Sequence, residues 1–480
     1  MPSKVIRNFC FAPFTHVPFS LFPSPFPRAL FHKAVEVQKS LQLLYFRAMR
    51  DFDFLKEMHR AQTETNEEFR QTVDFIENCY KDGFKQPLIL FCQRADYMAH
   101  ESEENNEKKL ELKQVNPCQF RPNWRPWHFV PCHNASSTSP FHGQCGHFAR
   151  GAAAQSHGHN GGQGTAHGMG IDTKLAQNPK IWSIFGQSPA VRPPNHTDTM
   201  VAKALHMAWN QFGNSEAVIL FLHFSPVDRL LIESYQVENE VERISNGRPK
   251  CVSSFYAKPL KGRLKLHPKN FSLILDDQFL VAVAVHRYNN ATQKQLRFTC
   301  EIIRRSTAIQ DSYRSLLAHT KLFTLPGVVE RFFPRPEEAH MVKAIREVLT
   351  KSWSIGEGDE EAEEIIKKVK INPEKYVMKW NECGCYILGQ EFFWNNFIIM
   401  EKLKPAQVKN HFIFPDSAPL LNVAATPELG IFGCLLGNIE DGTVLQQFSG
   451  EAHQMRTKSA TENEGGVWKG KSVCYSPLLV

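Results

Sequence analysis

Apolar residues recur every three or four positions in several segments of the chain, which is the spacing of an amphipathic helix. The segment 28–49, which follows Pro27, predicts a long helix that begins at the proline. The same spacing predicts four further helices, at 200–213, 228–248, 335–349 and 359–371. Gly213 and the Asn246-Gly247 pair are typical of helix ends. The chain therefore contains a substantial helical part.

Short apolar runs predict the strands. The runs at 87–94 and 216–224 are continuously apolar, as in strands buried on both faces. The segment 271–285 predicts two strands around an Asp276-Asp277 turn. Further strands are predicted at 375–379, 396–403 and 428–436. Because helices prevail early and strands late, and because a strand–helix unit is also present, we expect a mixed α+β or α/β enzyme of several lobes.

The strand predicted at 87–94 runs into the polar sequence QRADYM. Polar residues at the end of a buried strand often contact ligands in open α/β sheets. Arg94 is therefore a candidate site residue. On this pattern alone, a surface arginine after a strand is an equally good interpretation.

Residues 116–169 have neither helical nor strand periodicity. Gly, His, Ser and Pro dominate them, and such a segment cannot bury enough apolar surface to offset the entropy of ordering. We therefore expect 117–170 to be a disordered insertion. The alternative is a zinc site, because thiolate and imidazole are the preferred ligands of zinc. Its candidate ligands are Cys118, Cys132, His133, His142, Cys145 and His147, but no CxxC pair is present.

The bulk composition excludes several classes of protein. A chain of 480 residues is too long for one ordinary core, so we expect two or three lobes. The formal charge of +7 is small for this length and gives no nucleic-acid signature. The proline-rich N-terminus does not resemble a signal peptide, and no apolar run reaches the roughly 20 residues of a membrane span. The twelve cysteines have no paired spacing, which favours a reducing cytosol.

Charged residues and glycine turns follow the apolar segments of the C-terminal third. They occur at Lys379, in MEKL (400–403), in PELGIFG (427–433), around RTK (456–458) and in NEGGV (463–467). Cations can neutralise a triphosphate, carboxylates can hold Mg²⁺, and strand backbone can bind adenine. Together these residues suggest ATP-dependent ligation. Taken singly, each is more often an exposed residue in a surface ion pair.

The order of these segments resembles that of the eukaryotic glutathione synthetases, which have an ATP-grasp fold. The similar blocks are APFT, LFPSPFPRALF, LILFCQRADYM, LKQV, IESYQVENE, HTK, KYVMK, IIMEKL, PELGIFG, and RTK followed by GGV. They extend from about residue 12 to the C-terminus, apart from the insertion.

The resemblance implies a homodimeric, cytosolic, ATP-dependent carbon–nitrogen ligase. Such an enzyme joins γ-glutamylcysteine to glycine and uses ATP and Mg²⁺. ATP first phosphorylates the cysteinyl carboxylate, and the glycine amine then attacks this acyl phosphate to give glutathione. No nucleic-acid or membrane partner is expected.

The resemblance also assigns roles to residues at matching positions. Arg94 and Arg456 are expected to hold substrate carboxylates, and Arg287 and Val467 to contact substrate. The expected ATP-binding residues are Lys321, Lys379, Met400, Glu401, Lys402, Leu403, Glu428 and Lys458. The backbone of Glu401 and Leu403 is expected to contact the purine edge.

Two segments depart abruptly from the family pattern. After Lys379 the family has a loop with three successive glycines, whereas this chain reads WNECGCYILG, with Glu382 as the remaining candidate Mg²⁺ ligand. After LKQ, Asn116 replaces a family Mg²⁺-binding glutamate. The alternative to a working synthetase is therefore a catalytically impaired, synthetase-derived chain, or an aberrant gene model, that keeps the fold without efficient turnover.

The segments divide into three expected regions. Residues 1–213, with the insertion 117–170, form the N-terminal part of the ligase fold. Residues 214–317 form a substrate-binding domain, and 318–480 form the C-terminal ATP-grasp part with a lid.

Overall fold

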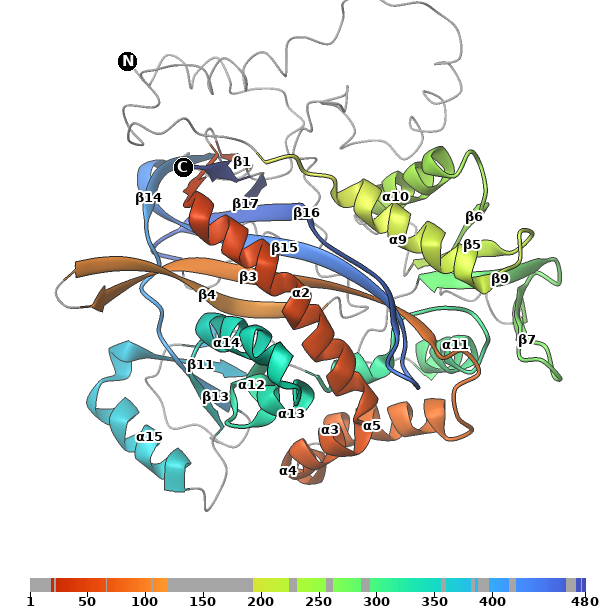
Figure 1. The fold of residues 1–480 in the computed structure, drawn as a ribbon, viewed down its shortest axis with the longest axis horizontal. Coiled ribbons are helices and arrows are strands. Elements are labelled where there is room, and N and C mark those ends of the chain that lie inside the picture. The colour runs from red at the N-terminus through yellow and green to blue at the C-terminus, as the bar shows by residue number, and fades with distance from the viewer. Residues whose placement is uncertain are drawn as a thin grey trace, which may run out of the picture.

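The structure is a computed structural model, and Figure 1 shows its ribbon. The residues that it describes are 19–20, 23–65, 67–104, 107–119, 193–223, 231–255, 262–285, 294–318, 320–354, 360–380, 385–386, 397–413, 420–462, 472–475 and 477–480.

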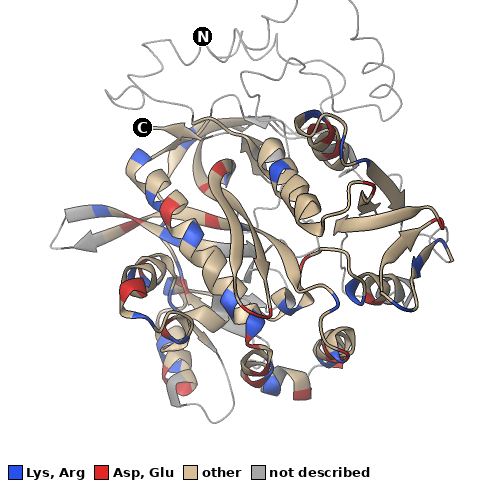
Figure 2. Cartoon of the chain, turned by 45° about the vertical axis from the view of Figure 1, so that its right-hand side comes forward, with Lys and Arg blue, Asp and Glu red and all other residues tan. Residues whose placement is uncertain are grey.

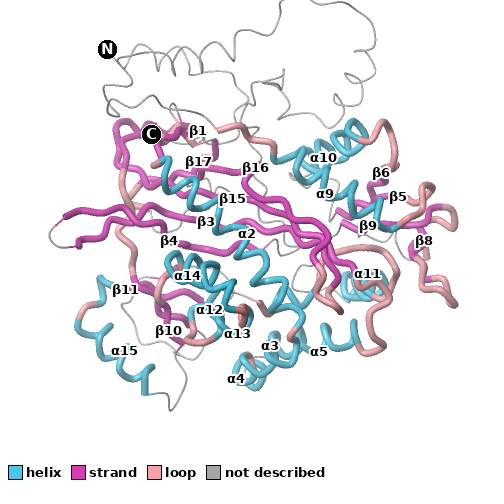
Figure 3. The backbone as a smooth tube through the Cα atoms, in the orientation of Figure 1, coloured by secondary structure: helices cyan, strands magenta, loops and turns pink. Residues whose placement is uncertain are grey.

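The largest sheet has seven strands, and all of its pairs are antiparallel. Five of its strands are hydrogen-bonded to one another in the order β1 (Phe19–Ser20), β14 (Val408–Ile413), β15 (Leu420–Asn438), β16 (Val444–Ser459) and β17 (Ser472–Tyr475). The remaining two strands are β3 (Leu88–Glu104), which pairs with β15, and β4 (Glu107–Gln119), which pairs with β3. The tube in Figure 3 shows β3, β4, β15 and β16 as long neighbouring strands.

Strand β15 joins the early and late parts of the chain. β14 and β3 pair with successive stretches of β15, and β16 also pairs with it from Ala425 onward. One prediction was wrong here, because the strand predicted at 87–94 continues to Glu104. The polar sequence QRADYM continues the strand because β15 and β4 supply backbone hydrogen bonds on both sides. Arg94 thus lies within a strand and is buried, which excludes the interpretation of a surface arginine.

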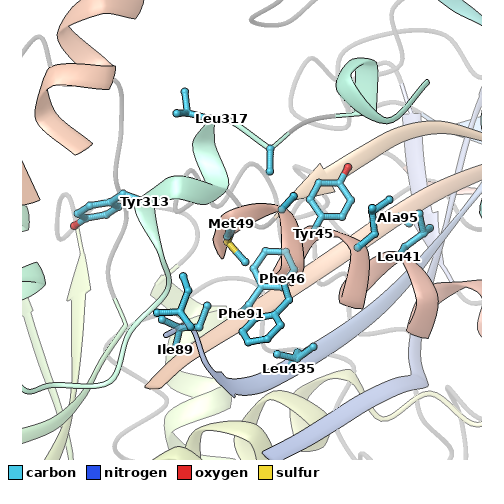
Figure 4. Packing of buried hydrophobic residues seen from close by; sticks show 14 of the residues in the cluster. Leu41, Tyr45, Phe46, Met49, Ile89, Phe91, Ala95, Tyr313, Leu317 and Leu435 are labelled. Atoms are coloured by element: carbon cyan, nitrogen blue, oxygen red, sulfur yellow. The ribbon is translucent and has the colours of Figure 1, made fainter. Parts of the chain in front are cut away.

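Helix α2 (Arg28–Arg50) crosses one face of this sheet, as predicted for the segment after Pro27. Its buried side chains include Leu41, Leu44 and Phe46, and Figure 4 shows several of them packed with Phe91 and Leu435 of the strands. This packing forms the main hydrophobic core.

Helix α9 (Thr197–Phe212) packs between the seven-stranded sheet and a smaller five-stranded sheet. It ends at Gly213, whose φ of 76° is left-handed, as the glycine stop predicted. The five-stranded sheet has the order β6 (Cys251–Phe255), β5 (Val218–His223), β9 (Phe279–Val285), β8 (Leu273–Leu275) and β7 (Leu264–Leu266). β6, β5 and β9 are parallel, and α10 (Leu231–Ile244) lies between β5 and β6 in the chain. The turn between β8 and β9 has positive φ at Asp276 and Asp277, as expected for a tight hairpin.

A third sheet, of four strands, has its own small core. Its order is β10 (Ser352–Ser354), β13 (Phe397–Glu401), β11 (Tyr376–Trp380) and β12 (Cys385–Tyr386). Ile399 of β13 packs against Ile365 and Val369 of α15 (Glu360–Ile371).

Short helices and one small strand pair complete the described structure. The helices are α3 (Phe52–Met58), α4 (Arg60–Thr65), α5 (Glu67–Tyr80), α11 (Lys294–Arg304), η2 (Tyr313–Leu316), α12 (Thr320–Thr324), α13 (Val328–Phe332), η3 (Pro336–Glu338), α14 (Ala339–Val348) and η4 (Pro373–Lys375). β18 (Leu478–Leu479) pairs in parallel with β2 (Pro25–Phe26). Within the described ranges, no helix is both long and apolar enough to cross a membrane.

The mixed helix and sheet architecture confirms the predicted fold class. The predicted insertion 117–170 lies outside the described residues, except that 117–119 continue β4. The domain boundaries at 213/214 and 317/318 stay predictions.

His453 of β16 is buried at the interface between the central sheet and α2. It lies opposite Ile431 of β15, and its ring centroid is 5.3 Å from that of Phe31 on α2. Neither ring nitrogen has a hydrogen-bond partner among the described residues. Burial, with a smaller contribution from His196, lowers the pKa of His453 to about 3. The imidazole is therefore neutral in the folded protein near neutral pH.

Truncation of a buried side chain of α2 should leave a cavity in the core and lower the free energy of unfolding. Leu44 is completely buried, so Leu44→Ala should lower the free energy of unfolding by about 2–5 kcal/mol, measured by urea denaturation. The matched control is Ile371→Ala, because Ile371 is 75% exposed and its truncation should change stability by less than about 0.5 kcal/mol. Similar losses in the two variants would contradict this description of the core.

His453 predicts a component of the pH dependence of stability. Between pH 6.5 and 3 the unfolded chain binds a proton at this residue and the folded protein does not. Lowering the pH through this range should therefore reduce the free energy of unfolding by about 1.4 kcal/mol per pH unit. His453→Phe should remove this component, whereas His340→Phe, at an exposed position of α14, should retain it. Urea unfolding at several pH values measures the difference, and parallel curves for wild type and His453→Phe would refute the assignment.

Candidate functional site

Two faces of β15 have different neighbours because side chains alternate along a strand. Leu429, Ile431 and Leu435 belong to the core formed with α2. Phe432 and Cys434 belong to the core formed with α9. Arg94, Asp96, Glu428, Arg456 and Lys458 lie on the second face, which we call the site face.

Arg94 and Asp96 form a buried ion pair on the site face. Nε of Arg94 donates to Asp96 Oδ1 at 2.6 Å, and Nη2 donates to Oδ2 at 2.7 Å. Nη1 of Arg94 makes a longer contact of 3.4 Å with Gln454 Oε1 on β16. The two side chains are only 9% and 2% exposed, so the carboxylate offsets the cost of burying the guanidinium. This geometry fixes the plane of the guanidinium.

Gly430 leaves the space that this ion pair occupies. It lies directly opposite Asp96 in the β15–β3 register. A Cβ atom at Gly430 would lie 2.9 Å from both Arg94 Cδ and Asp96 Oδ1, which is too close for a real Cβ contact. Gly430 of the sequence PELGIFG is therefore required by packing across the strands.

Glu428 and Arg456 form a second ion pair, two residues before Gly430 on β15. They lie directly opposite each other on β15 and β16, and Arg456 Nη2 donates to Glu428 Oε1. Glu428 is buried and Arg456 is partly buried. Lys458 follows on the same side of β16, opposite Thr426. The site face thus carries two arginines, one lysine and two carboxylates at neighbouring positions of β3, β15 and β16.

Asn116 of β4 extends this arrangement on the other side of β3. Its backbone is paired with that of Asp96, next to a register shift between Asp96 and Tyr97. The side chain of Asn116 lies outside the described residues. In the part of the chain that the structure describes, no group of three or more His, Cys, Asp and Glu side chains is placed to hold a metal ion.

The predicted adenine-binding residues lie on and just after β13 in the four-stranded sheet. Met400 is half-buried, and Glu401 and Lys402 are exposed. The Glu401 N–H donates to Lys351 O at 3.0 Å, and the Lys402 N–H donates to Lys375 O at 2.8 Å. The backbone of Lys379 on β11 pairs with Ile398. The segment is therefore held by backbone hydrogen bonds from two neighbouring parts of the chain.

Several predicted site residues lie wholly or partly outside the residues that the structure describes. Arg287, Glu382 and Val467 lie outside the described residues, and only the backbones of Lys321 and Lys379 are described. The zinc-site alternative likewise falls outside them, apart from the backbone of Cys118. The hypothesis of impaired catalysis depends on the same segments and receives no specific support.

Sequence reasoning missed Asp96 and the packing role of Gly430. The available signal was the Arg-x-Asp spacing, because residues two apart in a strand share a face. It was overlooked because Arg94 was predicted to lie at the end of its strand. Charges elsewhere are dispersed, and Figure 2 shows lysines and arginines interspersed with acidic residues along the helices.

Comparison with known proteins supplies the family. A model described as "Eukaryotic glutathione synthase, ATP binding domain" matches residues 5–117 and 173–479. The interval between the matched segments nearly coincides with the insertion expected at 117–170. The glutathione synthetase of Mus musculus is 25% identical over 493 residues, which cover 97% of this chain and 90% of that protein. That of Dictyostelium discoideum is 22% identical over 495 residues, with 97% and 92% covered.

Among solved structures, a glutathione synthetase-like effector (GSS30) from Globodera pallida, in the apo form, is similar to this chain. The two are 36% identical with a TM-score of 0.66, and the match covers 97% of this chain and 90% of the other. The fold and the matched model together define an ATP-dependent ligase of the ATP-grasp type. The chain belongs to the eukaryotic glutathione synthase family.

The buried ion pair predicts a stability difference between two aspartates. Asp96→Asn removes the charge that compensates buried Arg94, so the free energy of unfolding should fall by about 3–5 kcal/mol. Asp277→Asn is the matched control, since Asp277 is 72% exposed and its pair with Lys265 should contribute less than about 1 kcal/mol. Urea denaturation of both variants checks this, and an equal loss in the two would show that the Arg94–Asp96 pair is not effectively buried.

Proposed function

We propose that this chain joins γ-glutamylcysteine and glycine to form glutathione with hydrolysis of ATP to ADP and phosphate. Membership of the family supports this reaction. The observation that carries the proposal is the pair of arginines, Arg94 and Arg456, each held on the site face by a carboxylate. Guanidinium groups bind carboxylates by two parallel hydrogen bonds, and the dipeptide substrate is rich in carboxylates.

Arg94 would bind a substrate carboxylate in a fixed orientation. Asp96 accepts hydrogen bonds from the Nε and Nη2 edge, so a second carboxylate would approach from the Nη1 and Nη2 end. It would then replace the long contact between Nη1 and Gln454. Because Asp96 orients the guanidinium beforehand, little conformational entropy would be lost on binding.

Three lysines would act on the phosphates of ATP. Lys458, with Lys321 and Lys379, would neutralise charge while the γ-phosphoryl group moves to the cysteinyl carboxylate. Glu428 would complete the nucleotide site. Because the Glu401 N–H already donates to Lys351 O, the adenine edge would meet the Glu401 carbonyl and the Leu403 N–H instead. Arg287 and Val467 would contact the substrate.

Mg²⁺ is proposed to accompany ATP. Carboxylate and amide oxygens are its usual protein ligands, and the register of Asn116 opposite Asp96 supports an oxygen donor beside the site face. Glu382 would supply a further carboxylate. When bound, the ion would neutralise charge on the phosphates. A homodimer in the cytosol is also proposed, and the free thiols of Cys79, Cys92, Cys251 and Cys434 are compatible with a reducing compartment.

The reaction is tested by product formation. Purified full-length protein with ATP, Mg²⁺ and γ-glutamylcysteine should release phosphate only when glycine is added, and mass spectrometry should detect glutathione. Arg456→Lys keeps the charge but loses the two-point contact, so the KM for γ-glutamylcysteine should rise by about tenfold or more.

The control variant is Arg243→Lys, because Arg243 lies on α10 with its side chain 67% exposed. It should have wild-type kinetics. Absence of glycine-dependent phosphate release by the folded wild type would overturn the proposed reaction and favour the non-catalytic alternative.

A further inference from the structure

Two free cysteines face each other on neighbouring strands of the central sheet. Cys92 of β3 is directly opposite Cys434 of β15, and their Sγ atoms are 3.0 Å apart. Cys92 is two residues before Arg94 on the same strand, and Cys434 is two residues after Phe432, which lies opposite Arg94. The thiol pair therefore lies on the site face beside the Arg94–Asp96 ion pair.

The backbone geometry at this position suits a disulfide. Directly opposed residues of antiparallel strands have Cα atoms about 4.5–5.5 Å apart, and disulfides span Cα separations of about 4.4–6.8 Å. Bond formation needs the sulfur atoms to approach by only about 1 Å, to roughly 2.05 Å. A small movement of β3 relative to β15 would be sufficient.

The two thiols differ in access. Cys92 is half-buried, whereas Cys434 is completely buried. Contact with Cys434 and burial, with a smaller contribution from Asp311, raise the pKa of Cys92 well above its usual range. The pair is therefore expected to react slowly at neutral pH and faster as the pH rises.

We propose that Cys92 and Cys434 are a modification site at which a low-molecular-weight disulfide, such as glutathione disulfide, forms a reversible cross-strand disulfide. The choice of glutathione disulfide rests on the proposed function, because it is the oxidised form of the proposed product. The cross-link itself depends only on the geometry of the two thiols.

The reaction consists of two thiol–disulfide exchanges. The Cys92 thiolate attacks one sulfur of glutathione disulfide, the S–S bond breaks, and one glutathione thiolate leaves. The Cys434 thiol then loses its proton and attacks the Cys92 sulfur, and the second glutathione thiolate leaves. The protein loses two electrons and two protons, and one glutathione disulfide becomes two molecules of glutathione.

Cross-linking would act on the substrate site through the strands. Drawing β3 toward β15 at Cys92 changes the strand spacing next to Arg94, whose orientation depends on close packing with Gly430. A displacement of this size would weaken the contact between Arg94 and a substrate carboxylate. The KM for γ-glutamylcysteine should therefore rise by about tenfold in the oxidised protein. Dithiothreitol should reverse the change.

The test uses reduced full-length protein in buffers of increasing ratio of glutathione disulfide to glutathione, with alkylation, trypsin digestion and mass spectrometry. The tryptic peptides 86–94 and 410–456 each contain one cysteine, so their cross-link is unambiguous. We expect this cross-link in the wild type. Its rate of formation should rise about tenfold per pH unit, and dithiothreitol should remove it. Only a mixed disulfide at Cys92, or no modification of the folded protein, would overturn the proposal.

Matched variants separate the site from general oxidation. Cys251→Ser, at a half-buried cysteine of β6, should retain the cross-link, whereas Cys92→Ser should lack it and show no change of KM on oxidation. A cross-link that left KM unchanged would overturn the coupling to Arg94. Because mass spectrometry does not depend on turnover, an inactive protein that forms the cross-link would refute the proposed function and support this inference.

Discussion

Three glycines of one strand determine how closely the rest of the molecule approaches the central sheet. A Cβ atom at Gly437 would lie 2.8 Å from an α2 side chain, and Gly433 is similarly crowded on the same face. Gly430 provides the same space on the site face, where Arg94 and Asp96 lie over it. A side chain at Gly433 or Gly437 would collide with side chains of α2, and one at Gly430 would collide with Arg94 and Asp96 of the neighbouring strand β3. The main core and the oriented arginine thus both depend on the bare backbone of β15.

Burial then determines how the charged residues are arranged. An arginine inside a protein needs a compensating carboxylate, and Arg94 and Arg456 each have one on the site face. Asp96 accepts from two nitrogens of Arg94 and so fixes the plane of that guanidinium, and Glu428 accepts from Nη2 of Arg456. The Arg94–Asp96 pair therefore both compensates a buried charge and orients it, which is possible inside a strand because residues two apart share a face.

Most elements could be predicted from the sequence because their patterns are local. The helix after Pro27, the stop at Gly213 and the hairpin at Asp276-Asp277 follow from spacing and turn chemistry, and the structure confirms them. The extension of β3 beyond Arg94 could not be predicted in this way. Its polar residues stay in a strand because β15, far away in the sequence, pairs with them. Arg94 was identified from its strand pattern and by resemblance, and Arg456 and Glu428 by resemblance alone. The pairing of Arg94 with Asp96 over Gly430, and of Arg456 with Glu428, depends on strand register.

The sequence after Lys379 departs from the family's glycine-rich loop, but the strand before it, β11, is paired within the four-stranded sheet. The backbone of Lys379 pairs with Ile398 on one side and with Cys385 on the other. These backbone pairs hold β11 in the sheet whatever side chains follow it, because ladder hydrogen bonds do not depend on residue type. Every residue of WNECGCYILG still carries a backbone N–H, so the loss of successive glycines restricts the φ values that the segment can adopt and leaves the position of Lys379 in the sheet unchanged. The position of Lys379 and the backbone freedom of the residues after it thus depend on different parts of this segment.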